Sequence, residues 1–74
     1  MKVIVKLFAS FRTGRFVIEE REYPDGTTVG RVVEELGLSE QELGIMLVNS
    51  RHVKLDHQLA DSDTLALFPL LGGG

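Results

Sequence analysis

Cysteine is absent from the 74 residues of this chain. Its absence excludes a disulfide, a metal site with thiolate ligands and a thiol nucleophile. Long apolar runs are missing too: none approaches the roughly 20 residues of a membrane span, and the N-terminus shows no apolar segment followed by a small-residue cleavage site. We therefore expect no membrane partner and a cytoplasmic location.

Basic residues are few and scattered. Eight Lys and Arg face eleven Asp and Glu, giving a net charge of -3 and a pI near 5.2. Nucleic-acid binding is unexpected, because it draws its affinity from basic side chains that neutralise phosphates. The length fits one domain, which buries only about 60% of the surface of its unfolded chain. Such a small core makes a deep catalytic cleft difficult to build.

Alternating apolar residues predict a β-hairpin at the start of the chain. Val3, Val5 and Leu7 share one face of a strand over residues 2–8, and Phe16 and Ile18 fall in a second strand over residues 15–21. The short connection at residues 9–14 returns the chain antiparallel. A turn at residues 24–26, Pro-Asp-Gly, ends the hairpin.

The middle of the chain predicts one helix. Thr28 is a plausible N-cap and Gly37 a C-terminal stop. Between them, four residues at i, i+3, i+4 and i+7 form one apolar face: Val29, Val32, Val33 and Leu36. Val32, Val33 and Leu36 are predicted to be core residues.

A short helical turn is expected after the helix. Ser39 and Glu42 have the spacing of a capping box, and Leu38 and Leu43 that of a hydrophobic staple.

The remaining segments predict three more strands. The apolar run 45–48 suggests a strand buried on both faces, central in the sheet. A tight turn at 49–52 leads to a brief strand around Val53, and a turn at 61–63 precedes a last strand over 64–68, ended by Pro69. The order β, β, α, β, short β, β predicts an α+β fold: a mixed sheet with one main helix packed on one face.

Ordinary catalytic groups are not apparent. His52 and His57 do not share a helix face, so surface histidines are favoured over metal ligands. The carboxylates along the second strand and on the polar side of the helix are interpreted as a solvated face without an acid/base pair. We therefore expect no metal site and no catalysis by this chain alone. These carboxylates are Glu19, Glu20, Glu22, Glu34 and Glu35.

The compositional anomaly is the C-terminal run Gly72, Gly73 and Gly74. On its own, the run fits a frayed terminus or a functional tail. Lacking Cβ atoms, it could thread a narrow channel, and residues 70–74 extended would reach about 17 Å. The preceding apolar residues both finish the core and, in part, form a partner-binding patch. They are Phe68, Pro69, Leu70 and Leu71.

The sequence resembles the MoaD/ThiS family of ubiquitin-like sulfur carriers. The matching stretches are VKLFASFR with Phe8 and Arg12, PDGTTVGRVVEEL, the pair Val48-Asn49, LADSDTLAL, and Phe68-Pro69 leading to diglycine. The resemblance implies a β-grasp domain over residues 1–71 and a flexible glycine tail at 72–74. It also implies that Phe8, Arg12, Phe68 and Leu70 form a docking face.

The resemblance further implies how the tail works. The carboxylate of Gly74 would be adenylated by a ubiquitin-activating-enzyme-like adenylyltransferase that uses ATP, and then converted to a thiocarboxylate, so sulfur would ride on a carbonyl carbon. The chain itself would bind no cofactor. The similarity is greater to the MoaD branch, whose partner is the large subunit of molybdopterin synthase. A ThiS-like carrier for thiamine thiazole, a ubiquitin-like modifier joined through Gly74 to lysines, and a plain interaction module remain alternatives.

Overall fold

The computed structural model describes residues 1–70 of the chain. Its main elements are β1 (Lys2–Leu7), β2 (Ile18–Glu22), α1 (Val29–Glu35), β3 (Leu43–Val48), β4 (Arg51–His52) and β5 (Asp63–Pro69). Two short 3-10 helices are present as well, η1 (Ala9–Arg12) and η2 (Glu40–Glu42). The predicted order of strands and helix is confirmed, and no helix in these 70 residues is long and apolar enough to cross a membrane.

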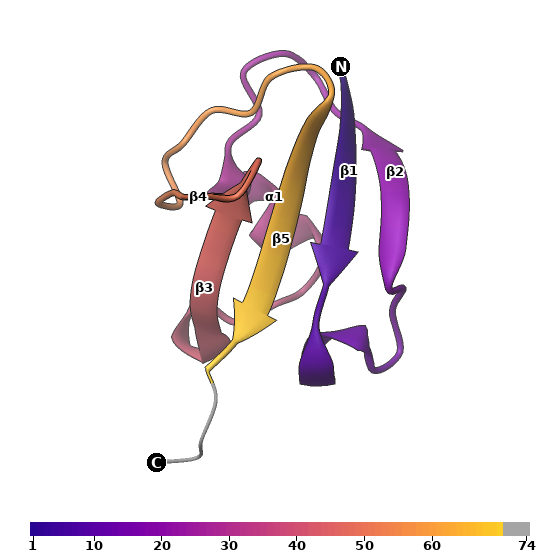
Figure 1. Cartoon of the computed structure of the whole chain (residues 1–74), viewed down its shortest axis with the longest axis vertical. Coiled ribbons are helices and arrows are strands. Elements are labelled where there is room, and N and C mark those ends of the chain that lie inside the picture. Colours follow the sequence, from indigo (N-terminus) through magenta and orange to yellow (C-terminus); the bar gives the residue numbers. More distant parts are fainter. Residues whose placement is uncertain (71–74) are drawn as a thin grey trace.

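The five strands form one mixed sheet in the order β2-β1-β5-β3-β4 (Figure 1). β1 and β5 run parallel, whereas the other neighbouring strands are antiparallel. The first and last strands of the chain therefore lie side by side, and α1 lies behind the sheet in Figure 1.

The core lies between the sheet and α1. Alternate residues of β1 and β5 point inward and are fully buried, as period-two strands require, and they meet the apolar face of the helix. The inward residues are Val3, Val5, Leu7, Leu65 and Leu67, and α1 contributes Val29, Val32 and Val33. Leu36, predicted in the core, is only partly buried against it.

The prediction for β3 was wrong in two respects. The central strand is β5, and β3 lies between β5 and the two-residue β4. One face of β3 is also open, since Ile45 keeps 42% of its surface exposed while Val48 is buried. The single helix covers only one side of the sheet, so an apolar run in β3 is not buried on both faces.

Both ends of α1 are capped as the sequence predicts. The Thr28 hydroxyl accepts a hydrogen bond from the Arg31 amide. Gly37 adopts φ 73°, and its amide and that of Leu38 donate to the carbonyls of Glu34 and Val33, which closes the helix in a Schellman motif.

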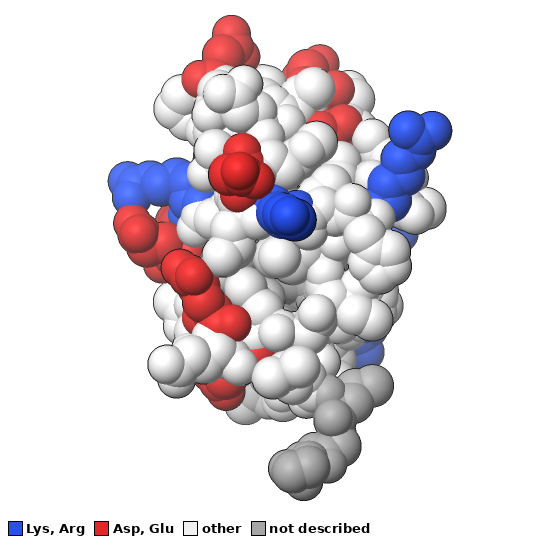
Figure 2. Space-filling view, turned by 90° about the vertical axis from the view of Figure 1, so that its left-hand side faces the viewer, with Lys and Arg blue, Asp and Glu red and all other residues white. Residues whose placement is uncertain are grey.

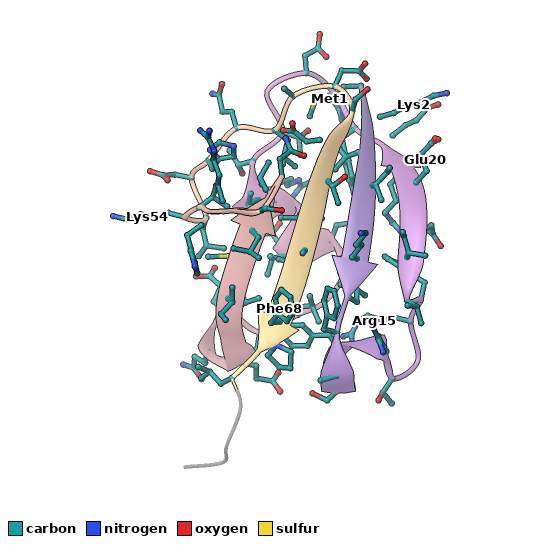
Figure 3. The ribbon with its side chains drawn as sticks, in the orientation of Figure 1. Met1, Lys2, Arg15, Glu20, Lys54 and Phe68 are labelled. Atoms are coloured by element: carbon teal, nitrogen blue, oxygen red, sulfur yellow. The ribbon has the colours of Figure 1, made fainter. Side chains whose placement is uncertain are left out.

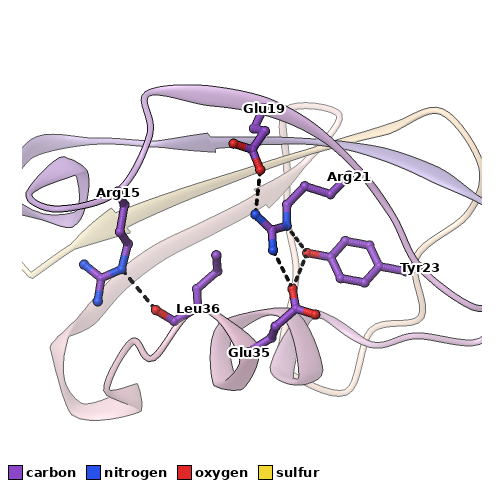
Figure 4. Close-up of polar contacts among 6 residues, drawn as sticks. All are labelled: Arg15, Glu19, Arg21, Tyr23, Glu35 and Leu36. Atoms are coloured by element: carbon purple, nitrogen blue, oxygen red, sulfur yellow. Dashed lines mark hydrogen bonds and ion pairs between the residues drawn. The ribbon is translucent and has the colours of Figure 1, made fainter.

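Arg15 adds a cation at the C-terminal end of α1. It donates from Nε to the Leu36 carbonyl at 3.0 Å (Figure 4) and from a terminal nitrogen to the Gly37 carbonyl at 3.4 Å. A positive charge there complements the negative end of the helix dipole. Arg15 was predicted to begin the second strand, but β2 starts at Ile18. The connection is longer than predicted because it contains η1, which buries Phe11.

The turn between β3 and β4 consists of Asn49 and Ser50, with φ of 51° and 71°. Two successive positive φ values are the signature of a type I′ hairpin. The Asn49 side chain accepts from the Thr64 amide and donates to Asp63, both at 2.9 Å, so it fixes the start of β5. The brief strand falls at Arg51–His52 rather than around Val53. Ser39 caps η2 through the Gln41 amide.

A charged network joins β2 to α1 (Figure 4). The Arg21 guanidinium donates to Glu19 at 2.7 Å and to Glu35 at 3.0 Å, and its Nε donates to the Tyr23 hydroxyl at 2.9 Å. Tyr23 in turn donates to Glu35 at 3.0 Å. Glu19 and Glu35 are thus ion-paired, and Glu34 pairs with Arg31 on the exposed side of α1. The interpretation of the carboxylates as simply solvated holds only for Glu20 and Glu22.

We predict that Val33→Asp lowers the free energy of unfolding by about 3 kcal/mol or more, because an unpaired carboxylate would be placed in the core. Val33 is 1% exposed, whereas Val17 is 53% exposed, so Val17→Asp is the matched control. The control should change stability by no more than about 0.5 kcal/mol. Urea denaturation of both variants makes the comparison, and equal losses would contradict the assigned core.

We also predict that stability falls from about pH 10 to pH 12. Burial and then the hydrogen bond to Glu35 raise the pKa of Tyr23 to about 12, above the value near 10 of an unfolded tyrosine. The folded state therefore binds this proton more tightly than the unfolded state does. The protonated Tyr23 network contributes its full stability below the pKa of the unfolded tyrosine, and this contribution is lost as pH rises through the pKa in the folded state.

Tyr23 is the only tyrosine of the chain, so phenolate absorbance follows its titration directly. Urea midpoints measured over the same pH range should decline more steeply for the native sequence than for Tyr23→Phe. A phenol that titrates near pH 10 in the folded protein would be inconsistent with the network.

Candidate functional site

The outer face of the sheet, turned away from α1, carries two stacked aromatic rings. Phe68 lies near the end of β5, as Figure 3 shows, and Phe8 follows the end of β1. Their ring centroids are 4.1 Å apart and the planes differ by 10°. The Phe8 amide also donates to the Leu67 carbonyl at 3.2 Å. Parallel pairing of β1 with β5 thus brings these two predicted docking residues together.

Arg12 joins the same cluster. Its Nε donates to the Leu7 carbonyl at 2.7 Å, and its guanidinium carbon lies 5.2 Å from the centroid of the Phe8 ring. A cation over an aromatic face is worth about 0.5–1 kcal/mol at an exposed site. The remaining guanidinium nitrogens leave Arg12 able to meet a partner.

Neighbouring strands extend the apolar surface. In the β3–β5 register Ile45 lies opposite Phe68 and Leu47 lies opposite Ala66. We call these residues the outer patch: Phe8, Ile45, Leu47, Ala66 and Phe68. Ile45 and Leu47 were missed by the sequence reasoning, which assigned the whole run 45–48 to the interior. The signal that could have found them is the single helix, which cannot cover two faces of a sheet.

The root of the C-terminal segment is held beside the outer patch. Leu70 donates its amide to the Glu42 carbonyl at 2.8 Å, and Pro69 pairs with Leu43 across a register shift in β3. Gly44 lies at that shift, where a Cβ would stand 2.7 Å from the Pro69 oxygen and 3.0 Å from the Leu70 nitrogen. Only glycine lets the end of β5 approach β3 this closely.

The predicted site residues near the C-terminus divide into two groups. Pro69 is buried in the sheet, while the Leu70 side chain is 64% exposed beyond it. Leu71 and the glycines at 72–74, which include the predicted reactive end Gly74, lie outside the described residues.

The two histidines lie elsewhere. His52 and His57 line an open recess of about 700 Å³ beside β4, together with Arg51 and Asp63. Within residues 1–70 no group of three or more His, Cys, Asp or Glu side chains could hold a metal ion.

Charge is distributed unevenly over the surface. Figure 2 shows acidic side chains along its left-hand margin, whereas uncharged residues cover most of the right-hand part. The arrangement as a whole offers no enclosed pocket with convergent catalytic groups in the described part of the chain. It offers an apolar sheet face with an anchored segment leaving from its edge, which is suited to docking another protein.

A mixed five-stranded sheet with one helix and this strand order is the β-grasp fold, so the chain is a ubiquitin-like protein. The model of the ThiS family matches residues 5–74. The chain belongs to this family of small ubiquitin-like sulfur carriers, as its resemblance to MoaD/ThiS proteins predicted.

Solved structures agree with this assignment. A Pyrococcus furiosus protein provisionally assigned as molybdopterin converting factor subunit 1 is 32% identical, with a TM-score of 0.78, over 93% of this chain and 97% of that one. SAMP1 of Haloferax volcanii, a small archaeal modifier protein, is 26% identical over the full length of both chains, with a TM-score of 0.77. A search of curated proteins found no match.

A third structure is similar in fold alone. It is a complex of subunits 1 and 2 of the molybdopterin-converting factor from Helicobacter pylori, matched at 19% identity and a TM-score of 0.68, with full coverage of both chains.

We predict that Gly44→Ala displaces the root of the C-terminal segment. The added methyl would meet backbone atoms of Pro69 and Leu70, which cannot rotate away, so stability should fall by about 1–3 kcal/mol. Hydrogen exchange at the Leu70 amide should accelerate more than exchange at the Val5 amide in β1.

Gln41→Ala, an exposed change in the neighbouring η2, is the control. It should leave both stability and Leu70 exchange nearly unchanged. Normal Leu70 exchange in Gly44→Ala would show that the close approach does not hold the segment.

Proposed function

We propose that this chain is the sulfur carrier of molybdopterin biosynthesis, for a molybdenum or tungsten cofactor, and that it carries sulfur as a thiocarboxylate on Gly74. The observation that carries the proposal is the anchored root of the segment at the edge of the outer patch. A partner seated on Phe8 and Phe68 would lie next to Leu70, where the C-terminal segment starts. Fully extended, residues 70–74 reach at most about 17 Å.

The proposed chemistry uses only the terminal carboxylate. A carboxylate oxygen of Gly74 attacks the α-phosphorus of ATP, pyrophosphate leaves, and an acyl-adenylate forms. A sulfide-level donor then attacks the carbonyl carbon, the bond to AMP breaks, and the thiocarboxylate results. The chain has no cysteine, so no side chain of its own competes as a sulfur acceptor through a thiol.

The catalytic groups for both steps would belong to partners. The first partner is a ubiquitin-activating-enzyme-like adenylyltransferase, which uses the ATP, so the carrier itself binds no cofactor. The second is the large subunit of molybdopterin synthase, where two sulfur transfers build the dithiolene. Similarity to the Pyrococcus furiosus subunit 1 supports this branch. In the Helicobacter pylori structure, subunit 1 of the molybdopterin-converting factor is in complex with subunit 2.

A second candidate function is attachment of the chain to lysines of other proteins through Gly74. The full-length similarity to SAMP1, a modifier protein, favours it. A carrier for the thiazole of thiamine is a third reading, consistent with the name of the matching family. All three require an activated C-terminal glycine and differ in the acceptor.

We predict that the native chain, incubated with the adenylyltransferase, ATP and a sulfur donor, exchanges one carboxylate oxygen for sulfur, which intact mass spectrometry detects. Deleting Gly74 should abolish transfer of sulfur to molybdopterin synthase without lowering the melting temperature. The deletion retracts the end by about 3.4 Å, which is comparable with the whole approach distance of about 3–3.5 Å that reacting atoms need.

Full sulfur transfer by the truncated chain would falsify the proposed mechanism. The modifier function is tested separately, by searching cell extracts for lysines joined to Gly74. Finding thiocarboxylate without such conjugates would exclude the modifier function and support the carrier function. The product formed by the acceptor enzyme, molybdopterin or the thiazole, would then separate the two carrier functions.

A further inference from the structure

Lys6 holds an unusual position on the outer face of the sheet. It lies between Val5 and Leu7, which are both fully buried, so its side chain leaves the opposite face of β1. Its cross-strand neighbours are Ile18 in β2 and Ala66 in β5, both apolar. Lys6 is itself partly buried, and none of the ion pairs within residues 1–70 includes it.

Two ordinary roles of a strand lysine do not account for this position. Lysine often protects a sheet edge against pairing with another chain, but β1 is an interior strand between β2 and β5. Lysine also pairs with acidic residues across strands. The diagonal neighbour of Lys6 on this face is Glu20, which lies opposite Ile4, and the two form no ion pair. The ammonium group is thus left without a carboxylate among the described residues.

A hollow of the surface lies beside Lys6. Its centre is Ala66, the smallest side chain of the outer patch, with Lys6 on one side and Leu47 on the other. The hollow is open, has a volume of about 530 Å³, and has a wall formed by the stacked rings of Phe8 and Phe68. Its far rim is polar, with Asn49, Ser50 and Thr64.

The polar rim offers little competing charge. The Asn49 side chain is already committed to Asp63 and to the Thr64 amide. Arg12, the other cation near the patch, lies over the Phe8 ring and does not line the hollow. Among the described residues that line the hollow, Lys6 is the charged one.

We propose that the hollow over Ala66 receives an apolar side chain of the adenylyltransferase, and that Lys6 pairs there with a carboxylate beside that side chain. This inference rests on the proposed function and names the chemistry by which the activating enzyme recognises the carrier. Docking on the outer patch strips water from Lys6, and a desolvated cation without a partner is strongly unfavourable. A partner surface lacking the carboxylate is rejected, so Lys6 determines specificity.

The test is steady-state formation of thiocarboxylate by the adenylyltransferase from the same genome, with ATP and a sulfur donor, as the concentration of the carrier is varied. Lys6→Glu should raise KM about tenfold or more, because like charges would meet in the interface. kcat should stay within about twofold, because the terminal carboxylate and its chemistry are unchanged. Lys6→Arg should restore most of the affinity.

Two further variants separate charge from shape. Ala66→Leu fills the hollow and should also raise KM. Lys54→Glu reverses an exposed charge that projects from the left-hand edge of the molecule in Figure 3 and does not line the hollow, so it should leave KM unchanged. Added salt should raise the KM of the native chain more than that of Lys6→Gln, because only the native chain loses an ion pair to screening. Melting temperatures check that every variant is folded.

The outcomes distinguish this inference from the proposed function. If the native chain is thiocarboxylated and Lys6→Glu keeps a native KM, the carrier function stands and the role of Lys6 is overturned. If a folded Lys6→Glu raises KM no more than Lys54→Glu does, the role is overturned as well. If the native chain forms no acyl-adenylate at all, the proposed function fails, and this inference fails with it.

Discussion

Parallel pairing between β1 and β5 is the constraint on which the rest of the structure depends. The two strands are about as far apart in sequence as a chain of this size allows, yet their inward residues form the most deeply buried part of the core. The same pairing places Phe8 beside Phe68 and brings β5 into contact with η1. The surface proposed to bind a partner is therefore built from both ends of the domain.

The candidate site is a surface rather than a cluster of reactive side chains. Among residues 1–70 there is no cluster of metal ligands, and no buried polar side chain lacks a hydrogen-bond partner. Rigid elements instead define where the C-terminal segment begins: the Leu70 amide is held by Glu42, and Gly44 admits the end of β5. The proposed carrier function requires this division, because its chemistry would be performed in a partner that must find the same atoms each time.

Local patterns in the sequence were sufficient for the element order, the helix and its caps, since these depend on spacing over a few residues. The run at 45–48 was misassigned because apolar composition does not reveal which face a strand buries. Ile45 and Leu47 are apolar although they do not face the core, because they form part of the outer patch. Gly44 and the Arg21 network also escaped prediction, because their reasons are contacts with residues distant in the sequence.

The position of β5 at the centre of the sheet has a consequence for synthesis of the protein. Contacts between β1 and β5 join the first and last strands made, so the fold has many contacts of long sequence separation, and such folds form slowly. On the ribosome the earlier strands must wait, with apolar surface uncovered, until the final strand emerges. A nascent chain that stalls before β5 has no assembled outer patch, because Ala66 and Phe68 belong to that strand. The docking surface therefore exists only once β5 has been made and has paired with β1.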